Sequence, residues 1–119
     1  MVNGVAPLLR RARAALLAVS LGCATAPRAP AAAADAEGAV LRYDGAADAV
    51  YVCGTMTGWE PVPLERDARG FGLTLPLPPG RYEYRLEVHR GGEVQVVVPE
   101  GAERTDDGFG GENAIVRVP

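Results

Sequence analysis

The sequence predicts an all-β fold, a small antiparallel sandwich of about seven strands. Three observations predict it. From Ala39 onward, short apolar runs with a period of two residues alternate with turns that contain Gly or Pro. No stretch of this region has a helical repeat, because Pro and Gly recur too often for one. With 119 residues, the chain has room for one small domain and short additional segments.

Residues 1–22 predict an export signal of the lipoprotein type. Three arginines precede the run AALLAVSLG, which has the length of a secretory apolar region and is too short to span a bilayer. The run ends in SLGC, which resembles the lipobox of bacterial lipoproteins, although Ser20 stands where Leu is usual. This resemblance implies that Cys23 is lipidated. The alternatives are an ordinary signal, cut near residues 24–34, and an uncleaved N-terminal anchor.

Residues 23–38 are predicted to form a disordered tether. The segment is rich in Ala and Pro and has no apolar periodicity, so it buries too little surface to offset the entropy of ordering it. Its prolines are expected to hold the domain that follows away from a membrane surface. An Asp directly after the lipidated Cys resembles an inner-membrane retention signal of some bacteria. Ala24 stands there instead, so we expect an exported protein anchored in a bacterial cell envelope, in the outer membrane where the host has one.

The strands of the sandwich are expected where the period of two is clearest. They cover residues 39–43, 48–53, 71–77, 81–89, 93–98 and 113–118. The segment 81–89 alternates most cleanly, with an apolar face that is expected to be core and a wet face of charged residues: Tyr82, Tyr84, Leu86 and Val88 against Arg81, Glu83, Arg85, Glu87 and His89. A long acidic loop is predicted over 99–111, and the strand at 113–118 is predicted to lie at an edge.

The segment VYVCGTMTGW, residues 50–59, brings the only tryptophan of the chain to a turn. Val50 and Val52 lie on one face of an extended segment, and Tyr51 and Cys53 on the other. The two glycines then end the strand. Trp59 is therefore expected in a loop at the end of a strand and not within the core.

Charge and composition exclude several classes of function. From Ala39 onward, 8 arginines stand against 13 acids, a net charge of −5, which argues against nucleic acid as a partner. Cys53 is expected to be a small buried residue. His89 has no second ligand at a metal-binding spacing, and the acidic residues 106–107 lack the pattern of a calcium loop. We therefore predict no metal and no cofactor. We also predict no catalysis, because glycoside hydrolysis needs two carboxylates placed across a cleft.

Four segments, in this order, resemble the glycogen-binding module of the AMP-activated protein kinase β subunit and of the N-termini of isoamylases and branching enzymes. They are VYVCGTMTGW, PLERDARGFGLTL, LPLPPGRYEYRLEV and FGGENAIVRV. The resemblance covers residues 39–118 and implies an immunoglobulin-like sandwich of the early-set type. The domains are then a signal at 1–22, a tether at 23–38 and the binding-like domain at 39–119.

The same resemblance implies a sugar site. Trp59 matches the tryptophan that stacks on a glucose ring. Arg85 and Asn113 match the residues that hydrogen-bond sugar hydroxyls, and Phe109 stands where the family often has a Leu under the glucan. The chain departs from the family in two places: HRGGEVQ replaces the segment with a second tryptophan, and Met-Thr replaces the aromatic-Asn pair before Trp59.

Each of these residues also has a structural interpretation. Trp59 can pack against the edge of the sandwich and close the turn. Arg85 can belong to a solvated charged row with Glu83 and Glu87, and Asn113 can hydrogen-bond the backbone where the loop meets the strand.

Two hypotheses follow. The first is a non-catalytic module that binds α-glucan (glycogen, starch or maltodextrin) and is displayed on an envelope lipoprotein attached to the membrane by its lipid. The second is an early-set structural or interaction domain that has lost the sugar and binds an envelope protein. The missing second tryptophan favours the second hypothesis. Retention of Trp59, Arg85 and Asn113 together favours the first.

Overall fold

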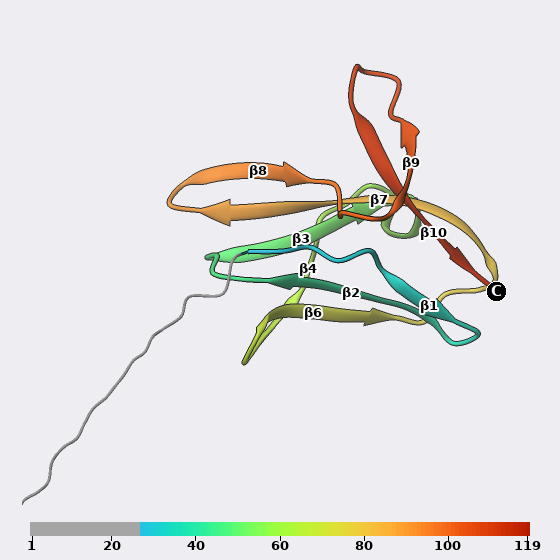
Figure 1. Ribbon diagram of the computed structural model, residues 1–119, viewed down its shortest axis with the longest axis horizontal. Coiled ribbons are helices and arrows are strands. Elements are labelled where there is room, and N and C mark those ends of the chain that lie inside the picture. Colours follow the sequence, from blue (N-terminus) through green and yellow to red (C-terminus); the bar gives the residue numbers. More distant parts are fainter. Residues whose placement is uncertain (1–26) are drawn as a thin grey trace, which may run out of the picture.

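A computed structural model describes residues 27–119 and shows a sandwich of two antiparallel sheets (Figure 1). The four-stranded sheet has the order β1 (Ala33–Asp35), β2 (Gly38–Asp44), β6 (Gly70–Leu75) and β5 (Glu65–Asp67). The six-stranded sheet has the order β4 (Val62–Pro63), β3 (Ala49–Gly54), β7 (Gly80–Arg90), β10 (Glu112–Val118) and β9 (Glu103–Asp106), and β8 (Glu93–Val97) pairs with β7. The predicted all-β sandwich is confirmed.

Strand β7 organises the larger sheet. It is 11 residues long, and β3 pairs with its residues 84–89 along one edge. On the other edge, β10 pairs with its first half, over 80–84, and β8 pairs with its second half, over 86–90. The predicted apolar face of β7 is the core face, since Tyr84, Leu86 and Val88 are each 1% exposed. The opposite face is half-buried and is less exposed to solvent than predicted.

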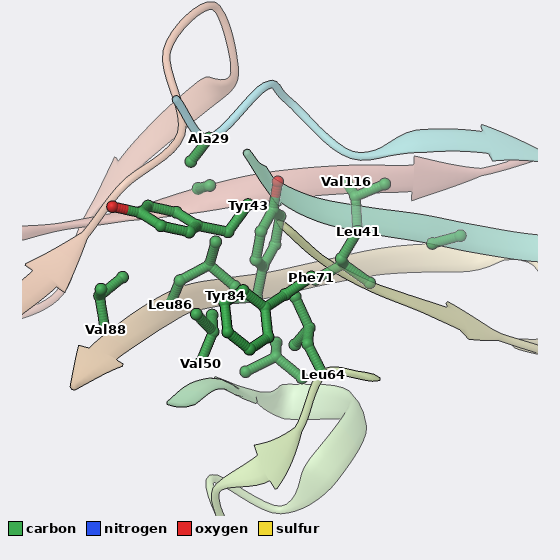
Figure 2. Packing of buried hydrophobic residues seen from close by; sticks show 13 residues of the cluster. Ala29, Leu41, Tyr43, Val50, Leu64, Phe71, Tyr84, Leu86, Val88 and Val116 are labelled. Carbon is green, nitrogen blue, oxygen red and sulfur yellow. The ribbon is translucent and has the colours of Figure 1, made fainter. Parts of the chain in front are cut away.

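The core lies between the two sheets. In Figure 2, Tyr84, Leu86 and Val88 from β7 meet Leu41 and Tyr43 from β2. The same cluster includes Val50 and Val52 from β3, Leu64, Phe71 from β6, and Ala114 and Val116 from β10. Burying one such side chain stabilises a fold by about 1.5–3 kcal/mol, so this cluster fixes the position of β7 and of the side chains on its other face.

The prediction of a disordered tether is wrong for residues 27–38, the part of it that the structure describes. Arg28 exchanges backbone hydrogen bonds with Asp44, and residues 33–35 pair with β2 as β1. Ala29 is 7% exposed in the core, and the Ala32 N–H donates to the hydroxyl of Tyr84 at 3.1 Å. These hydrogen bonds and the burial of Ala29 order the segment, although its sequence has no apolar periodicity. The predicted signal and Cys23 lie outside the described residues.

Two other predictions are corrected. The loop expected over 99–111 contains β9, which pairs with β10 from Glu103 to Asp106. As a consequence β10, predicted at an edge, lies between β7 and β9. Short strands β1, β4, β5 and β9 raise the number of strands above the seven expected. Residues 27–119 include no helix with the length and apolar character needed to cross a membrane.

Candidate functional site

The face of the six-stranded sheet that points away from the core, here called the outer face, carries the candidate site. Its residues alternate with the core residues along three paired strands. On β7 and β3, Arg85 stands opposite Cys53 and Glu87 opposite Tyr51. On β10, Ile115 stands opposite Glu83. The pleat of the sheet therefore holds aromatic, charged and amide side chains on one surface.

A short turn places Trp59 over this face. The 3₁₀ turn η4 (Thr55–Thr57) follows β3, and the Trp59 N–H donates to the carbonyl of Gly54 at 2.9 Å. The Thr57 hydroxyl accepts from the Gly54 N–H at 3.1 Å and donates to its carbonyl at 3.0 Å. The Glu83 N–H donates to the Thr55 hydroxyl at 3.1 Å, which ties the turn to β7. These bonds hold the indole in place.

The backbone of Trp59 has an unusual conformation. Its φ is +63°, the only positive φ of a non-glycine residue in 27–119. A left-handed conformation costs an ordinary residue roughly 1–2 kcal/mol, and the hydrogen bonds of the turn offset this cost. The side chain is 40% exposed, so it is not buried against the edge of the sandwich. The ring is held open to solvent at one side.

Arg85 lies beneath the indole. Its guanidinium carbon is 5.5 Å from the centre of the Trp59 ring, a cation–π contact worth about 0.5–1 kcal/mol near a surface. Among the described residues, Arg85 forms no ion pair with Glu83 or Glu87, and its buried Nε atom has no hydrogen-bond partner. The charged row predicted as the alternative is therefore not a row of ion pairs at Arg85. Among residues 27–119, the Arg85 guanidinium has the Trp59 ring as its neighbour and forms no ion pair.

Asn113 is the buried polar residue of this face. It is 4% exposed, and its Nδ2 donates to Glu83 Oε1 at 3.3 Å. The carboxylate of Glu83 also accepts from Arg81 Nη1 at 2.9 Å. The Oδ1 atom of Asn113 is buried and has no partner among residues 27–119. Asn113 thus bonds a side chain and not the backbone, and it retains an unused acceptor.

Phe109 lies at the tip of the β9–β10 hairpin. The Asp107 Oδ1 accepts from the N–H of Phe109 at 2.7 Å and from that of Gly111 at 3.0 Å. These backbone bonds, together with the nearby charge of Arg85, hold the pKa of the Asp107 carboxyl below its usual value. The loop presents Phe109 to solvent, and this residue is 95% exposed.

The sequence analysis did not predict the contacts between neighbouring groups on the outer face. The Cys53 thiol donates to Glu87 Oε2 at 3.4 Å. Burial, and then this hydrogen bond, raise the pKa of the thiol to about 11. The ring of His89 lies 4.9 Å from that of Tyr51. The alternation of Tyr51 and Cys53 in β3 was the signal for this face, but the pairing with β7 that brings these groups together is not readable from either strand alone.

The arrangement is suited to binding. The half-exposed ring of Trp59 and the guanidinium of Arg85 lie together on the outer face, on the same side of the sheet as Asn113, and a ring and a planar set of donors suit a flat polyhydroxylated ligand. Within 27–119 no cluster of three or more His, Cys, Asp or Glu residues could hold a metal ion. The thiol of Cys53 is protonated at neutral pH, because its pKa is raised.

Comparisons with known proteins find one matching family and several similar sequences. The model of the family described as the glycogen recognition site of AMP-activated protein kinase matches residues 38–119. The pig (Sus scrofa) 5′-AMP-activated protein kinase subunit beta-1 is 35% identical over 57 residues, 48% of this chain and 47% of the relative. The rat (Rattus norvegicus) and mouse (Mus musculus) subunits are 35% identical over 55 residues, 46% of this chain and 20% of each relative. The match thus spans about half of the pig sequence and a fifth of the others.

Proposed function

The chain belongs to the family of the glycogen recognition site of AMP-activated protein kinase, a carbohydrate-binding module, and from this premise we propose that its outer face binds α-glucan without catalysing a reaction. The ligand class is glycogen, starch or maltodextrin. One observation carries the proposal: a half-exposed Trp59 is held over Arg85, on the same face as an unpartnered oxygen of Asn113.

We assign a part in binding to each side chain. A glucose ring exposes flat C–H surfaces, and these pack on the indole of Trp59 while its hydroxyls remain free. The free N–H groups of Arg85 donate to adjacent hydroxyls, since a guanidinium is a planar set of donors. The Oδ1 of Asn113 accepts from a hydroxyl, which gives this buried acceptor a partner. Phe109 contacts the ligand from the β9–β10 loop.

The expected affinity is weak. One stacking contact adds about 1 kcal/mol beyond area burial, and a few hydrogen bonds are partly offset by the loss of bound water. We expect a dissociation constant of about 0.1–1 mM, which corresponds to roughly 4–5.5 kcal/mol. Binding of a polymer by many tethered copies is stronger than binding by one.

The tethering of copies is part of the proposal. The sequence SLGC at 20–23 supports lipidation of Cys23 and display in a bacterial cell envelope. Mass spectrometry of the protein from its native membrane tests this, because lipidation adds acyl chains to residue 23 and removes residues 1–22. A Cys23→Ser variant is expected to lose the added mass. A native N-terminus at any other residue would contradict the anchor.

A second candidate function is an early-set domain that binds an envelope protein and no sugar. One observation favours it: Glu93 and Val94 occupy the region where the family resemblance places a second stacking tryptophan, and Val94 is 55% exposed. An apolar surface of this kind serves a protein partner better than a hydroxyl-rich ligand.

Affinity electrophoresis in gels that contain glycogen separates the two functions. The protein should begin at residue 27 and not at 39, because Ala29 and Ala32 pack with the core. Glycogen is expected to retard this protein. Trp59→Ala is expected to abolish the retardation. Val40→Ala, at a residue that is similarly exposed but lies on the other sheet, is expected to retain it. Equal mobility with and without glycogen, for a protein shown to be folded, would contradict glucan binding.

A further inference from the structure

Four edge strands of the described domain, β4, β1, β5 and β9, are short, charged or contain proline. An open edge exposes unpaired backbone groups, and natural proteins protect edges with short strands, charges or proline. Here β4 has two residues and includes Pro63, β1 has three residues, β5 reads Glu-Arg-Asp and β9 reads Glu-Arg-Thr-Asp. Strand β8 reads Glu-Val-Gln-Val-Val and contains no Lys, Arg or Pro. Figure 1 shows it at the margin of the molecule, with β7 on one side only.

The turn that precedes β8 determines which backbone groups are free. Gly91 and Gly92 both have positive φ, +60° and +85°, as a two-residue type I′ hairpin turn requires. In such a hairpin the flanking pair, Arg90 and Glu93, is hydrogen-bonded, and the pairs alternate from there. Gln95 and Val97 therefore point their N–H and C=O groups toward β7. Those of Val94 and Val96 point away from it.

The two residues of β8 whose backbone N–H and C=O groups point away from β7 are also the ones with exposed apolar side chains. Val94 and Val96 are each 55% exposed and lie on the outer face, since they stand opposite His89 and Glu87. Within residues 27–119, neither Val94 nor Val96 forms a backbone hydrogen bond outside the paired strands. One edge thus combines open backbone groups with two exposed valines.

We propose that β8 pairs with β8 of a second copy of this chain, antiparallel, about a twofold axis at Gln95. In this register the N–H and C=O of Val94 pair with those of Val96 in the second copy, and the symmetric pair forms in the same way. Each exposed valine then lies beside a valine, a favourable cross-strand pair. The sequence Val-Gln-Val is symmetric about its centre, which is why the same strand can serve as both partners.

Charge also favours a second copy of the chain as the partner of β8. The antiparallel register places the two Glu93 residues, the charged residue of each β8, at opposite ends of the strand pair. Glu93 meets the end of the second strand, where Arg104, which also pairs with Glu112 at 3.2 Å, donates to the carbonyls of Val98 and Pro99 at 3.5 and 3.4 Å. Both side chains lie on the core side of the sheet, because Glu93 is opposite Arg90 and Arg104 is opposite Ala114. A parallel pairing would instead place Glu93 beside Glu93.

The dimer has a consequence for the outer face. A twofold axis perpendicular to a continuous sheet keeps the two outer faces on the same side, so the Trp59 residues of both copies face the same way. A polymer that contacts one copy is then positioned for the other, and this raises the effective concentration of the second contact. The dimer itself does not depend on sugar binding.

Sedimentation velocity of the full chain with Cys23→Ser, over a series of concentrations, measures the dimer directly. Val96→Lys adds a charge to the open edge and is expected to raise the dissociation constant of the dimer at least tenfold. Val40→Lys is the matched control, because Val40 is 43% exposed on β2, which is paired on both sides. It is expected to dimerise as the parent does. A parent chain that sediments as a monomer throughout, or an equal effect of both substitutions, would overturn the proposal.

Oxidation of a second pair of variants tests the register. In the same parent, Gln95→Cys places two thiols across the twofold axis, at a non-hydrogen-bonded position where side chains approach most closely. A disulfide-linked dimer is expected to form rapidly, and the same chemistry with Val40→Cys is expected to give little. Crosslinking of Val40→Cys at an equal rate would contradict pairing at β8.

Discussion

Asn113→Leu should separate the stability of the domain from its binding of glucan. A buried acceptor without a partner costs about 1–3 kcal/mol, and the Oδ1 of Asn113 is such an atom within the described chain. Leucine has a similar size and removes it. The substitution also removes the bond from Nδ2 to Glu83, worth about 1.5 kcal/mol to a charged acceptor that stays partly exposed. The free energy of unfolding should therefore equal that of the wild type or exceed it by about 1 kcal/mol.

Binding should change in the opposite direction. Loss of one hydrogen bond to a sugar hydroxyl corresponds to about 1.4 kcal/mol, or a tenfold weaker affinity. Urea unfolding followed by circular dichroism measures the stability, and calorimetric titration with maltoheptaose measures the affinity. Asn113→Ala is the control, since it removes the same groups and leaves a cavity, so it should be less stable than the leucine variant. A leucine variant destabilised by more than about 1 kcal/mol, with unchanged affinity, would refute the reasoning.

Three further predictions concern other parts of the domain. Phe109→Ser should leave the melting temperature unchanged, because this side chain is 95% exposed, and should weaken maltoheptaose binding by about fivefold; a changed melting temperature would show that the ring packs on the fold. The pKa of the Cys53 thiol is raised from 9.0 to about 11. The protonated thiol therefore stabilises the fold fully below pH 9, and this stabilisation is lost as the pH rises to 11. Urea unfolding across this range should show a loss of up to about 3 kcal/mol in the wild type that Cys53→Ala lacks, and parallel curves would contradict the shift. Tyr84→Phe removes the acceptor of the Ala32 N–H and should lower stability by about 1 kcal/mol, with faster amide exchange at Ala32; unchanged exchange would argue against that bond.

The strands with a period of two could be predicted from the sequence. In β7, Tyr84, Leu86 and Val88 alternate with charged residues, and the structure buries the apolar set as expected. The segment 27–38 could not be predicted, because alanine carries no periodic signal and its burial depends on the neighbouring tyrosine. Strand β9 was hidden in the same way, since Glu-Arg-Thr-Asp has no apolar face and forms a strand only because β10 offers an edge.

The candidate site was predicted only in its residue types. The sequence resemblance pointed to Trp59, Arg85, Asn113 and Phe109, and the family model that matches residues 38–119 confirms the resemblance. The contact between Trp59 and Arg85 depends on the register of β3 against β7, which neither strand specifies alone. The threonines that hold the turn were also missed, because Thr55 and Thr57 read as ordinary turn residues.

The most direct test of the central claim is titration of residues 27–119 with maltoheptaose while the fluorescence of Trp59 is followed. It is the only tryptophan of the chain, so the signal reports on the site itself. Saturable quenching with a dissociation constant of about 1 mM or lower is the expected result, and Asn113→Leu should shift the curve to higher concentrations. A folded protein that gives no response up to about 10 mM, well above the expected dissociation constant, would contradict glucan binding by the outer face.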